Sequence, residues 1–213
     1  MRIYFVRHGE SEANAAKRGQ GKEGPLSEQG RAQAAALAKR LTHEDVEVII
    51  SSDYERAIET ASIIATALGK PTDHSPLLGE RQYPSTLIGA DLENDEAKQL
   101  VNAFIRHPNG EEWKHSDEEN FVELKERAEA ASQFIAGRSE ERVVIVSHAD
   151  FLRFIVAYLA FGPEMSTRES VHLRHFMSIK NTGLTVIDYK KPDEEHPEPR
   201  WKLITWNDHA HLG

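Results

Sequence analysis

The chain has 213 residues, which suits one domain or one domain with an insertion, and it contains no cysteine. The lack of cysteine excludes a disulfide framework, a cysteine nucleophile and thiolate-bound zinc or iron–sulfur clusters. Acidic residues outnumber Lys and Arg by 35 to 26, and the resulting net charge of −9 argues against nucleic acid as a partner. No apolar run approaches the ~20 residues of a membrane span, so we expect no membrane partner and a cytoplasmic location.

Short apolar runs alternate with stretches in which apolar residues recur at helical spacing, which predicts buried strands and amphipathic helices in alternation. The predicted strands are Ile3–Val6, Val46–Ile50, Val143–Val146, Phe176–Lys180, Leu184–Tyr189 and an edge strand over Trp201–Trp206. The predicted helices are one capped by Ser27, one capped by Asp53, and three more over Asp95–Arg106, Asn120–Ala136 and about Leu152–Leu159. This order is typical of an α/β sheet with helices on both faces.

Two of the predicted strands end in the same way. Val6 is followed by Arg-His-Gly-Glu, and Val146 is followed by Ser-His-Ala-Asp. Because the carboxyl ends of parallel strands meet at one edge of a sheet, we expect His8 and His148 to share a site. The small residue after each histidine would let a backbone N–H face an anion. The alternative is two unrelated histidines in strand-ending loops, which the matched contexts make less attractive.

A cation near the start of a predicted helix points to the same kind of ligand. If Asp53 caps this helix, Arg56 is its third residue, where the positive end of the helix dipole disfavours a cation. An anion bound there would account for it. The alternative is an exposed Arg56 paired with Glu55 or Glu59. Together with Arg7, the predicted site is electropositive in an acidic protein and suits a phosphate dianion.

Such a site can transfer a phosphoryl group with side chains alone. One histidine, kept neutral, could be the nucleophile, and the other, protonated, could help to hold the transferring oxygens. Because phosphoryl transfer depends mainly on positioning and charge stabilisation, no metal or other cofactor is required when side chains supply the cations. The pairs His172/His175 and His209/His211 lack the cysteines or motif of a metal centre, so we expect no metal site.

Four motifs follow one another along the chain: Arg7-His8-Gly9-Glu10 with Asn14, Pro25-Leu26-Ser27-x-x-Gly30, Ser51-Ser52-Asp53-x-x-Arg56-Ala57-x-x-Thr60-Ala61, and Ser147-His148. This ordered set resembles the histidine phosphatase superfamily, the phosphoglycerate-mutase-like proteins. The resemblance implies a three-layer α/β/α sandwich with a mostly parallel central sheet. The chain has no internal repeat and no linker long enough to divide domains, so we expect one domain over residues 1–213. Because loops over a rigid sheet carry specificity, we expect residues 81–120 to form a lid or insertion over the active site.

The resemblance further implies a covalent two-step mechanism in which His8 attacks phosphorus and becomes phosphohistidine. It assigns phosphate binding to Arg7, Asn14, Arg56 and His148. The family also places a carboxylate over the site as proton donor to the leaving group, and Glu80 falls in the matching region. The alternative for Glu80 is a solvated loop glutamate.

Departures from the family pattern bear on the reaction. Cofactor-dependent mutases of this kind carry a Trp where Ala13 precedes Asn14, yet Glu80-Arg81-Gln82-Tyr83 resembles a mutase substrate loop with one extra residue. We therefore favour a metal-independent phosphomonoesterase acting on a small-molecule phosphate monoester or a phosphoprotein. Phosphoglycerate-mutase-type phosphoryl transfer and a non-catalytic phosphoprotein-docking module are the alternatives. The sequence does not specify the oligomeric state.

Overall fold

A six-stranded sheet forms the centre of the computed structural model, which describes residues 1–106 and 110–213. The strands are β1 (Arg2–Arg7), β2 (Val48–Ser51), β3 (Thr72–His74), β4 (Arg142–Ser147), β5 (Leu184–Lys190) and β6 (Arg200–Asp208). Their order across the sheet is β3-β2-β4-β1-β5-β6. Strands β1 to β4 run parallel, whereas β5 and β6 are antiparallel to their neighbours.

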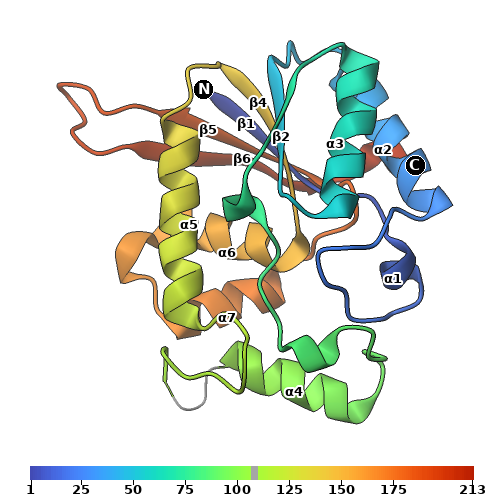
Figure 1. The fold of residues 1–213 in the computed structure, drawn as a ribbon. Coiled ribbons are helices and arrows are strands. Elements are labelled where there is room, and N and C mark those ends of the chain that lie inside the picture. The colour runs from blue at the N-terminus through green and yellow to red at the C-terminus, as the bar shows by residue number, and fades with distance from the viewer. Residues whose placement is uncertain (107–109) are drawn as a thin grey trace.

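Helices cover both faces of this sheet (Figure 1). They are α1 (Glu12–Ala15), α2 (Glu28–Leu41), α3 (Glu55–Leu68), α4 (Asp95–Arg106), α5 (Phe121–Ala136), α6 (Ala149–Phe161) and α7 (Thr167–Phe176). Helices α2 and α3 lie on one face and α5 and α6 on the other, while α4 lies beyond the carboxyl ends of the strands (Figure 1). The predicted three-layer α/β/α sandwich with a mostly parallel sheet is confirmed.

The strand residues divide between two hydrophobic cores because successive side chains point to opposite faces. In β1, Tyr4 and Val6 pack with α2 and α3, and Ile3 and Phe5 pack with α5 and α6. All four are at most 1% exposed, so β1 is buried on both faces, as the unbroken apolar run predicts. Because β1 is buried between the two helical layers, the polar residues that follow it lie at the carboxyl edge of the sheet.

Most predicted elements agree with the structure, with small changes at their ends. Helix α4 has the predicted bounds, and Ser27 caps α2 by accepting the Gly30 N–H at 3.0 Å. Helix α3 begins one residue later than predicted, because Tyr54 is its N-cap and Asp53 instead pairs with Lys22 at 2.8 Å. Arg56 is therefore the second residue of α3 and still lies in its first turn.

The predicted strand over Phe176–Lys180 is wrong. Phe176 ends α7, and the carbonyls of the residues after it accept from side chains instead of from a neighbouring strand. The carbonyls of residues 177, 178 and 179 accept from Arg153, Trp206 and Arg7, in that order. Helix α7 was not predicted because none of its residues is buried, and the exposed strand β3 has no apolar run to reveal it.

Within the described residues, no helix is long and apolar enough to cross a membrane. Residues 107–109, which fall in the expected lid over 81–120, lie outside the described residues. The rest of that segment contains α4 and passes below the carboxyl ends of β1, β2 and β4 in the view of Figure 1.

Candidate active site

Side chains from three strand ends meet at one edge of the sheet. His8 follows β1 and His148 follows β4, and these strands are adjacent and parallel. The His8 N–H donates to the Ser147 carbonyl at 2.9 Å, and the centroids of the two imidazole rings are 5.0 Å apart. Arg56 enters from the first turn of α3, after β2. The structure thus brings together three residues that are 48 to 140 positions apart in the sequence.

His8 is buried, and its hydrogen bonds define its tautomer. Its Nδ1 lies 2.6 Å from the Gly9 carbonyl oxygen, which can only accept, so Nδ1 carries the proton and Nε2 carries the lone pair. Arg56 Nε donates to this Nε2 at 3.2 Å. Burial lowers the pKa of His8 well below its usual value, and the charges of Arg56 and Arg7 lower it further. The ring is therefore neutral at pH 7, with an unprotonated nitrogen suited to nucleophilic attack.

His148 differs from the protonated partner that the sequence suggested. Burial, Arg56 and the neighbouring His8 lower its pKa well below 6.5, so it is neutral as well. Its Nε2 lies 2.6 Å from Ser52 Oγ, which also accepts the Tyr54 N–H at 3.3 Å. We assign the Ser52 hydroxyl proton to this contact, which leaves a proton on His148 Nδ1. That nitrogen is buried without a hydrogen-bond partner among the described residues, so it can donate to a phosphoryl oxygen.

Two guanidinium groups flank the histidines, that of Arg7, which is half-buried, and that of Arg56, which is buried. Arg7 Nη1 donates to the Ile179 carbonyl at 3.1 Å, and Arg56 Nη1 donates to the Gly21 carbonyl at 2.8 Å. Burial lowers the pKa of both arginines, while the charge of Glu80 opposes this shift. Neither forms an ion pair within the part of the chain that the structure describes. Two desolvated cations held this way suit a doubly charged anion.

Asn14 belongs to the short helix α1, whose N-terminus is closed by a capping box with Ser11. Its Oδ1 accepts from Arg7 Nη2 at 3.5 Å and from Asn181 Nδ2 at 3.4 Å. Asn181 Nδ2 also donates to the His8 carbonyl at 3.0 Å. Asn14 therefore lies beside His8 and Arg7 and accepts a hydrogen bond from the Arg7 guanidinium.

The Gly9 backbone does not play the part expected from the sequence. Its N–H donates to Thr60 Oγ1 at 3.0 Å and is therefore not available to an anion. A Cβ on Gly9 would lie 2.5 Å from the Gly30 carbonyl oxygen, so glycine is required by the close approach of α2. Ala149, the corresponding residue after His148, does line the pocket.

Glu80 is held at the N-terminus of α6. Its Oε1 accepts the N–H groups of Phe151 at 2.9 Å, Arg81 at 3.0 Å and Asp150 at 3.1 Å. Burial and the charge of Asp150 raise the pKa of Glu80, although the backbone bonds and Arg56 oppose this rise. A carboxyl group with a raised pKa that lines the same pocket as His8 is suited to donate a proton.

A second polar cluster was not predicted from the sequence. Asp150 is buried and accepts from Arg153 at 3.0 Å, from Arg174 at 3.1 Å and from the Tyr83 hydroxyl. Burial works against ionisation of Asp150, but Arg174 and Arg153 hold its pKa below the usual value. Arg174 comes from α7, and its position cannot be inferred from the sequence because the sequence does not predict that helix. The acid in the repeated strand-end pattern was the one available signal for Asp150.

Most of these groups line one pocket of about 640 Å³, although His148 and Arg153 are not among its lining residues. Arg7, His8, Arg56 and Glu80 line one part of it, and residues of the expected lid line another, including an apolar group of Leu87, Ile88, Leu92 and Val101. No group of three His, Asp or Glu side chains in the described ranges is arranged to hold a metal ion. The cavity therefore combines a cationic region around His8 with an apolar wall.

Comparison with known proteins agrees with this arrangement. A sequence profile of the histidine phosphatase superfamily (branch 1) matches residues 3–208. A "Probable phosphoglycerate mutase GpmB" of Yersinia pestis is 31% identical and aligns with 100% of this chain and 95% of its own length. A mycobacterial glucosyl-3-phosphoglycerate phosphatase in complex with VO3 superposes with a TM-score of 0.76 at 25% identity, covering 97% of this chain and 98% of the other.

A phosphoserine phosphatase from Entamoeba histolytica has the same fold, with a TM-score of 0.76 at 23% identity over 99% of this chain and 98% of the other. The profile match spans nearly the whole chain, and the probable mutase is similar over 95% of its own length. The chain belongs to the histidine phosphatase superfamily.

Proposed function

We propose that the protein is a metal-independent phosphomonoesterase that forms a phosphohistidine on His8. The observation that carries this proposal is the state of His8, a buried neutral imidazole whose Nε2 lone pair lies beside Arg56. Arg7 and Arg56 supply the positive charge that the transferring oxygens need. Catalysis by this set of residues therefore requires no added Lewis acid.

In the first step, the lone pair of His8 Nε2 forms a bond to phosphorus. The bond from phosphorus to the ester oxygen breaks, and its electron pair stays on that oxygen. Glu80 gives its proton to the same oxygen, so the alcohol leaves neutral. Arg7, Arg56, Asn14 and His148 hold the three remaining phosphoryl oxygens. The step ends with phosphohistidine and an ionised Glu80.

In the second step, a water molecule attacks the same phosphorus from the vacated side. Glu80 now acts as a base and takes one proton from this water, since the reverse of donation uses the same group. The bond between phosphorus and His8 Nε2 breaks, and its electron pair returns to the nitrogen. Inorganic phosphate is released, and both His8 and Glu80 regain their starting states.

We propose a small organic phosphate monoester as the substrate. The pocket of about 640 Å³ has room for a leaving group larger than a three-carbon acid, and Leu87, Ile88 and Leu92 offer it an apolar surface. The related mycobacterial enzyme is named for a glucosyl-3-phosphoglycerate substrate. A phosphoprotein remains the alternative substrate for the same chemistry.

Mutase activity is the second candidate, because Arg81 and Tyr83 line the pocket and the 31% identical relative is named as a mutase. A mutase must return the phosphoryl group to its product. Incubation with 3-phosphoglycerate and a phosphorylated primer distinguishes the two reactions. Isomerised phosphoglycerate would support the mutase, and release of inorganic phosphate alone would support the phosphatase.

The test of the main proposal is phosphate release from an aryl phosphate in excess chelator. Wild type is compared with His8→Ala and with His43→Ala, a matched change at an exposed histidine outside the site. We expect turnover in wild type and His43→Ala and none in His8→Ala. Enzyme quenched in alkaline denaturant should also carry phosphate on His8 that is stable to alkali and released by acid. Normal turnover by His8→Ala would reject the proposal, and tight phosphopeptide binding without turnover would favour a docking module.

A further inference from the structure

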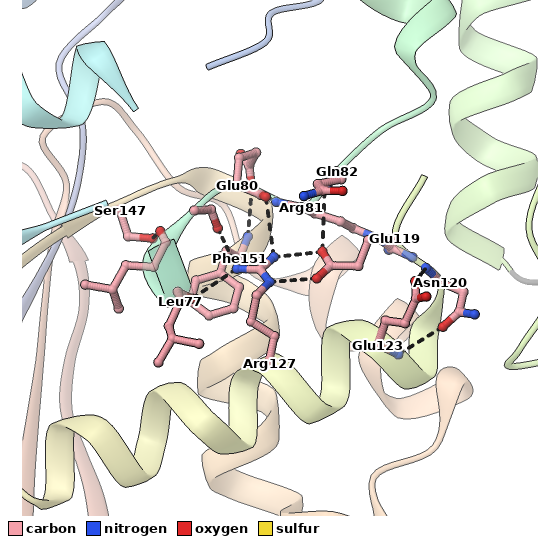
Figure 2. Close-up of polar contacts among 12 residues, drawn as sticks. Leu77, Glu80, Arg81, Gln82, Glu119, Asn120, Glu123, Arg127, Ser147 and Phe151 are labelled. Atoms are coloured by element: carbon pink, nitrogen blue, oxygen red, sulfur yellow. Dashed lines mark hydrogen bonds and ion pairs between the residues drawn. The ribbon is translucent and has the colours of Figure 1, made fainter. Parts of the chain in front are cut away.

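Arg127 on α5 faces the segment that carries Glu80, and the described contacts use all five of its N–H groups (Figure 2). Its acceptors are the Leu77, Gly79 and Glu80 carbonyls and both carboxylate oxygens of Glu119. The side chain is 17% exposed. A cation with this many fixed contacts constrains the groups around it.

The first constraint acts on the backbone of residues 77–80. Arg127 Nη1 donates to the carbonyls of Leu77 at 3.0 Å and Gly79 at 2.9 Å, and Nη2 reaches the Glu80 carbonyl at 3.4 Å. One guanidinium therefore fixes the backbone from which the Glu80 side chain extends. The planar fork matters here, because its donors leave in directions that an ammonium cannot reproduce.

The second constraint acts through Phe151. The Arg127 guanidinium lies over the Phe151 ring, 4.2 Å from its centroid. The Phe151 N–H donates to Glu80 Oε1 at 2.9 Å. Arg127 thus contacts both the backbone of Glu80 and the residue that holds its carboxyl group.

The third constraint joins the two ends of the expected lid. Arg127 Nε and Nη2 bind the two oxygens of Glu119 at 2.6 and 2.7 Å, a bidentate pair. Glu119 accepts the Gln82 N–H at 3.4 Å and donates its own N–H to the Gln82 carbonyl at 3.0 Å. The chain therefore leaves for the lid at Gln82 and returns at Glu119 beside the same cation, as Figure 2 shows.

We propose that Arg127, paired with Glu119, is a positioning residue that holds Glu80 at the distance and angle needed for proton donation. This inference rests on the proposed role of Glu80 as the proton donor. Arg127 forms no described hydrogen bond with His8 or with the proposed phosphate-binding residues, and its charge helps to lower the pKa of His148. Because Arg127→Lys keeps that charge, loss of the guanidinium hydrogen bonds should act on the reaction through Glu80. A purely structural ion pair would instead affect all substrates alike.

The test compares two substrates in the full-length protein. An aryl phosphate leaves as a weakly basic phenolate and needs little protonation, whereas an alkyl phosphate leaves as a strongly basic alkoxide and needs the donor. Arg127→Lys keeps the positive charge but loses the planar guanidinium and its five N–H donors. We expect its kcat for the alkyl phosphate to fall on the order of 10²-fold, the effect of a misplacement of about 1 Å, with little change for the aryl phosphate.

The matched control is Arg2→Lys. Arg2 forms a bidentate pair of the same kind with Asp188, at 2.7 and 2.9 Å, but lies at the opposite end of β1 from the site. Arg2→Lys should not lower kcat for the alkyl phosphate more than kcat for the aryl phosphate. Glu119→Gln provides a second variant that keeps Arg127 and its carbonyl contacts, and we expect the same selective loss at smaller size, whether or not Arg127→Lys folds.

A double variant separates the inference from the function on which it rests. Glu80→Gln should itself lose the alkyl phosphate selectively, and Arg127→Lys added to Glu80→Gln should bring no further selective loss. Equal losses for both substrates, or an undiminished effect of Arg127→Lys on the Glu80→Gln background, would overturn the positioning role. If Glu80→Gln alone shows no selectivity, Glu80 is not the donor and both statements are overturned.

Discussion

His8 Nδ1 lies 2.6 Å from the carbonyl oxygen of Gly9, the next residue in the chain. This single backbone contact decides which ring nitrogen is protonated and so leaves Nε2, the atom beside Arg56, with its lone pair. The proposed nucleophile and its orientation are thus defined by the turn that follows β1. No second side chain is needed to act as its base, in contrast to a serine nucleophile.

The first prediction concerns how activity depends on pH. Burial lowers the pKa of His8, so the acidic limb of the activity profile should lie well below pH 6.5. Activity is lost as the pH falls through the pKa of His8, because the protonated ring has no lone pair for attack. The pKa of Glu80 is raised by burial, and the protonated form donates, so activity toward an alkyl phosphate falls as the pH rises through it. Profiles of kcat/KM should be bell-shaped in wild type. A basic limb that persists unchanged in Glu80→Gln would argue against this assignment.

The second prediction concerns Arg56. Its guanidinium is buried next to His8 Nε2, where charge develops on the transferring oxygens. We expect Arg56→Ala to lower kcat by about 10²–10³-fold, as for removal of one preorganised transition-state donor. Arg31→Ala is a suitable control, because Arg31 also contacts the α3 region through Glu59 but lies outside the pocket. Steady-state rates with an aryl phosphate decide the point, and a loss below threefold would contradict it.

The sequence predicts the strand ends well because they depend on local patterns. The apolar runs of β1 and β4 each stop at a polar residue before a histidine, and parallel pairing then brings His8 and His148 to one edge. The fold class and the family follow from the same ordered motifs. Glu80 is expected as the proton donor only from its position in the family pattern, and the structure adds its bonds to the N-terminus of α6.

Other features depend on contacts between distant segments and leave little local signal. Arg127 and Glu119 read as ordinary surface charges, although α5 brings their pair against the Glu80 segment. Arg174 depends on α7, whose side chains are not buried and so give no clear helical pattern. Residues 176–180 resemble a strand in the sequence, but Arg7 and Arg153 occupy carbonyls that a strand would use.

The third prediction concerns stability and pH. His8 and His148 are neutral in the folded protein because their pKa values lie well below 6.5, whereas in the unfolded chain they titrate near that value. As the pH falls below 6.5, the unfolded state takes up protons that the folded state does not. Each histidine should therefore lower the free energy of unfolding by about 1.4 kcal/mol per pH unit in that window.

Denaturant unfolding at several pH values tests this. His8→Asn removes one titrating group, so its free energy of unfolding should fall less steeply than that of wild type between about pH 6 and 5, the window just below the unfolded histidine pKa. His43→Asn, at an exposed position, should follow the wild-type slope. Parallel slopes for all three proteins would show that His8 takes up its proton in the folded state.

The last prediction concerns the Asp150 cluster. Asp150 binds Arg153 on its own helix and Arg174 on α7, and it also accepts from Tyr83 in the expected lid. Asp150→Ala would leave two arginines without this buried partner, which costs about 3 kcal/mol, the lower end of the range for a broken buried pair because Arg174 is partly exposed. Asp150→Asn keeps the shape and some hydrogen bonds and should cost less. Because Tyr83 lines the pocket, KM should rise in both variants, more in Asp150→Ala.

Denaturation midpoints measure the loss of stability, and steady-state kinetics measure the change in KM. If Asp150→Ala is as stable as wild type, the cluster does not hold α7 against the site.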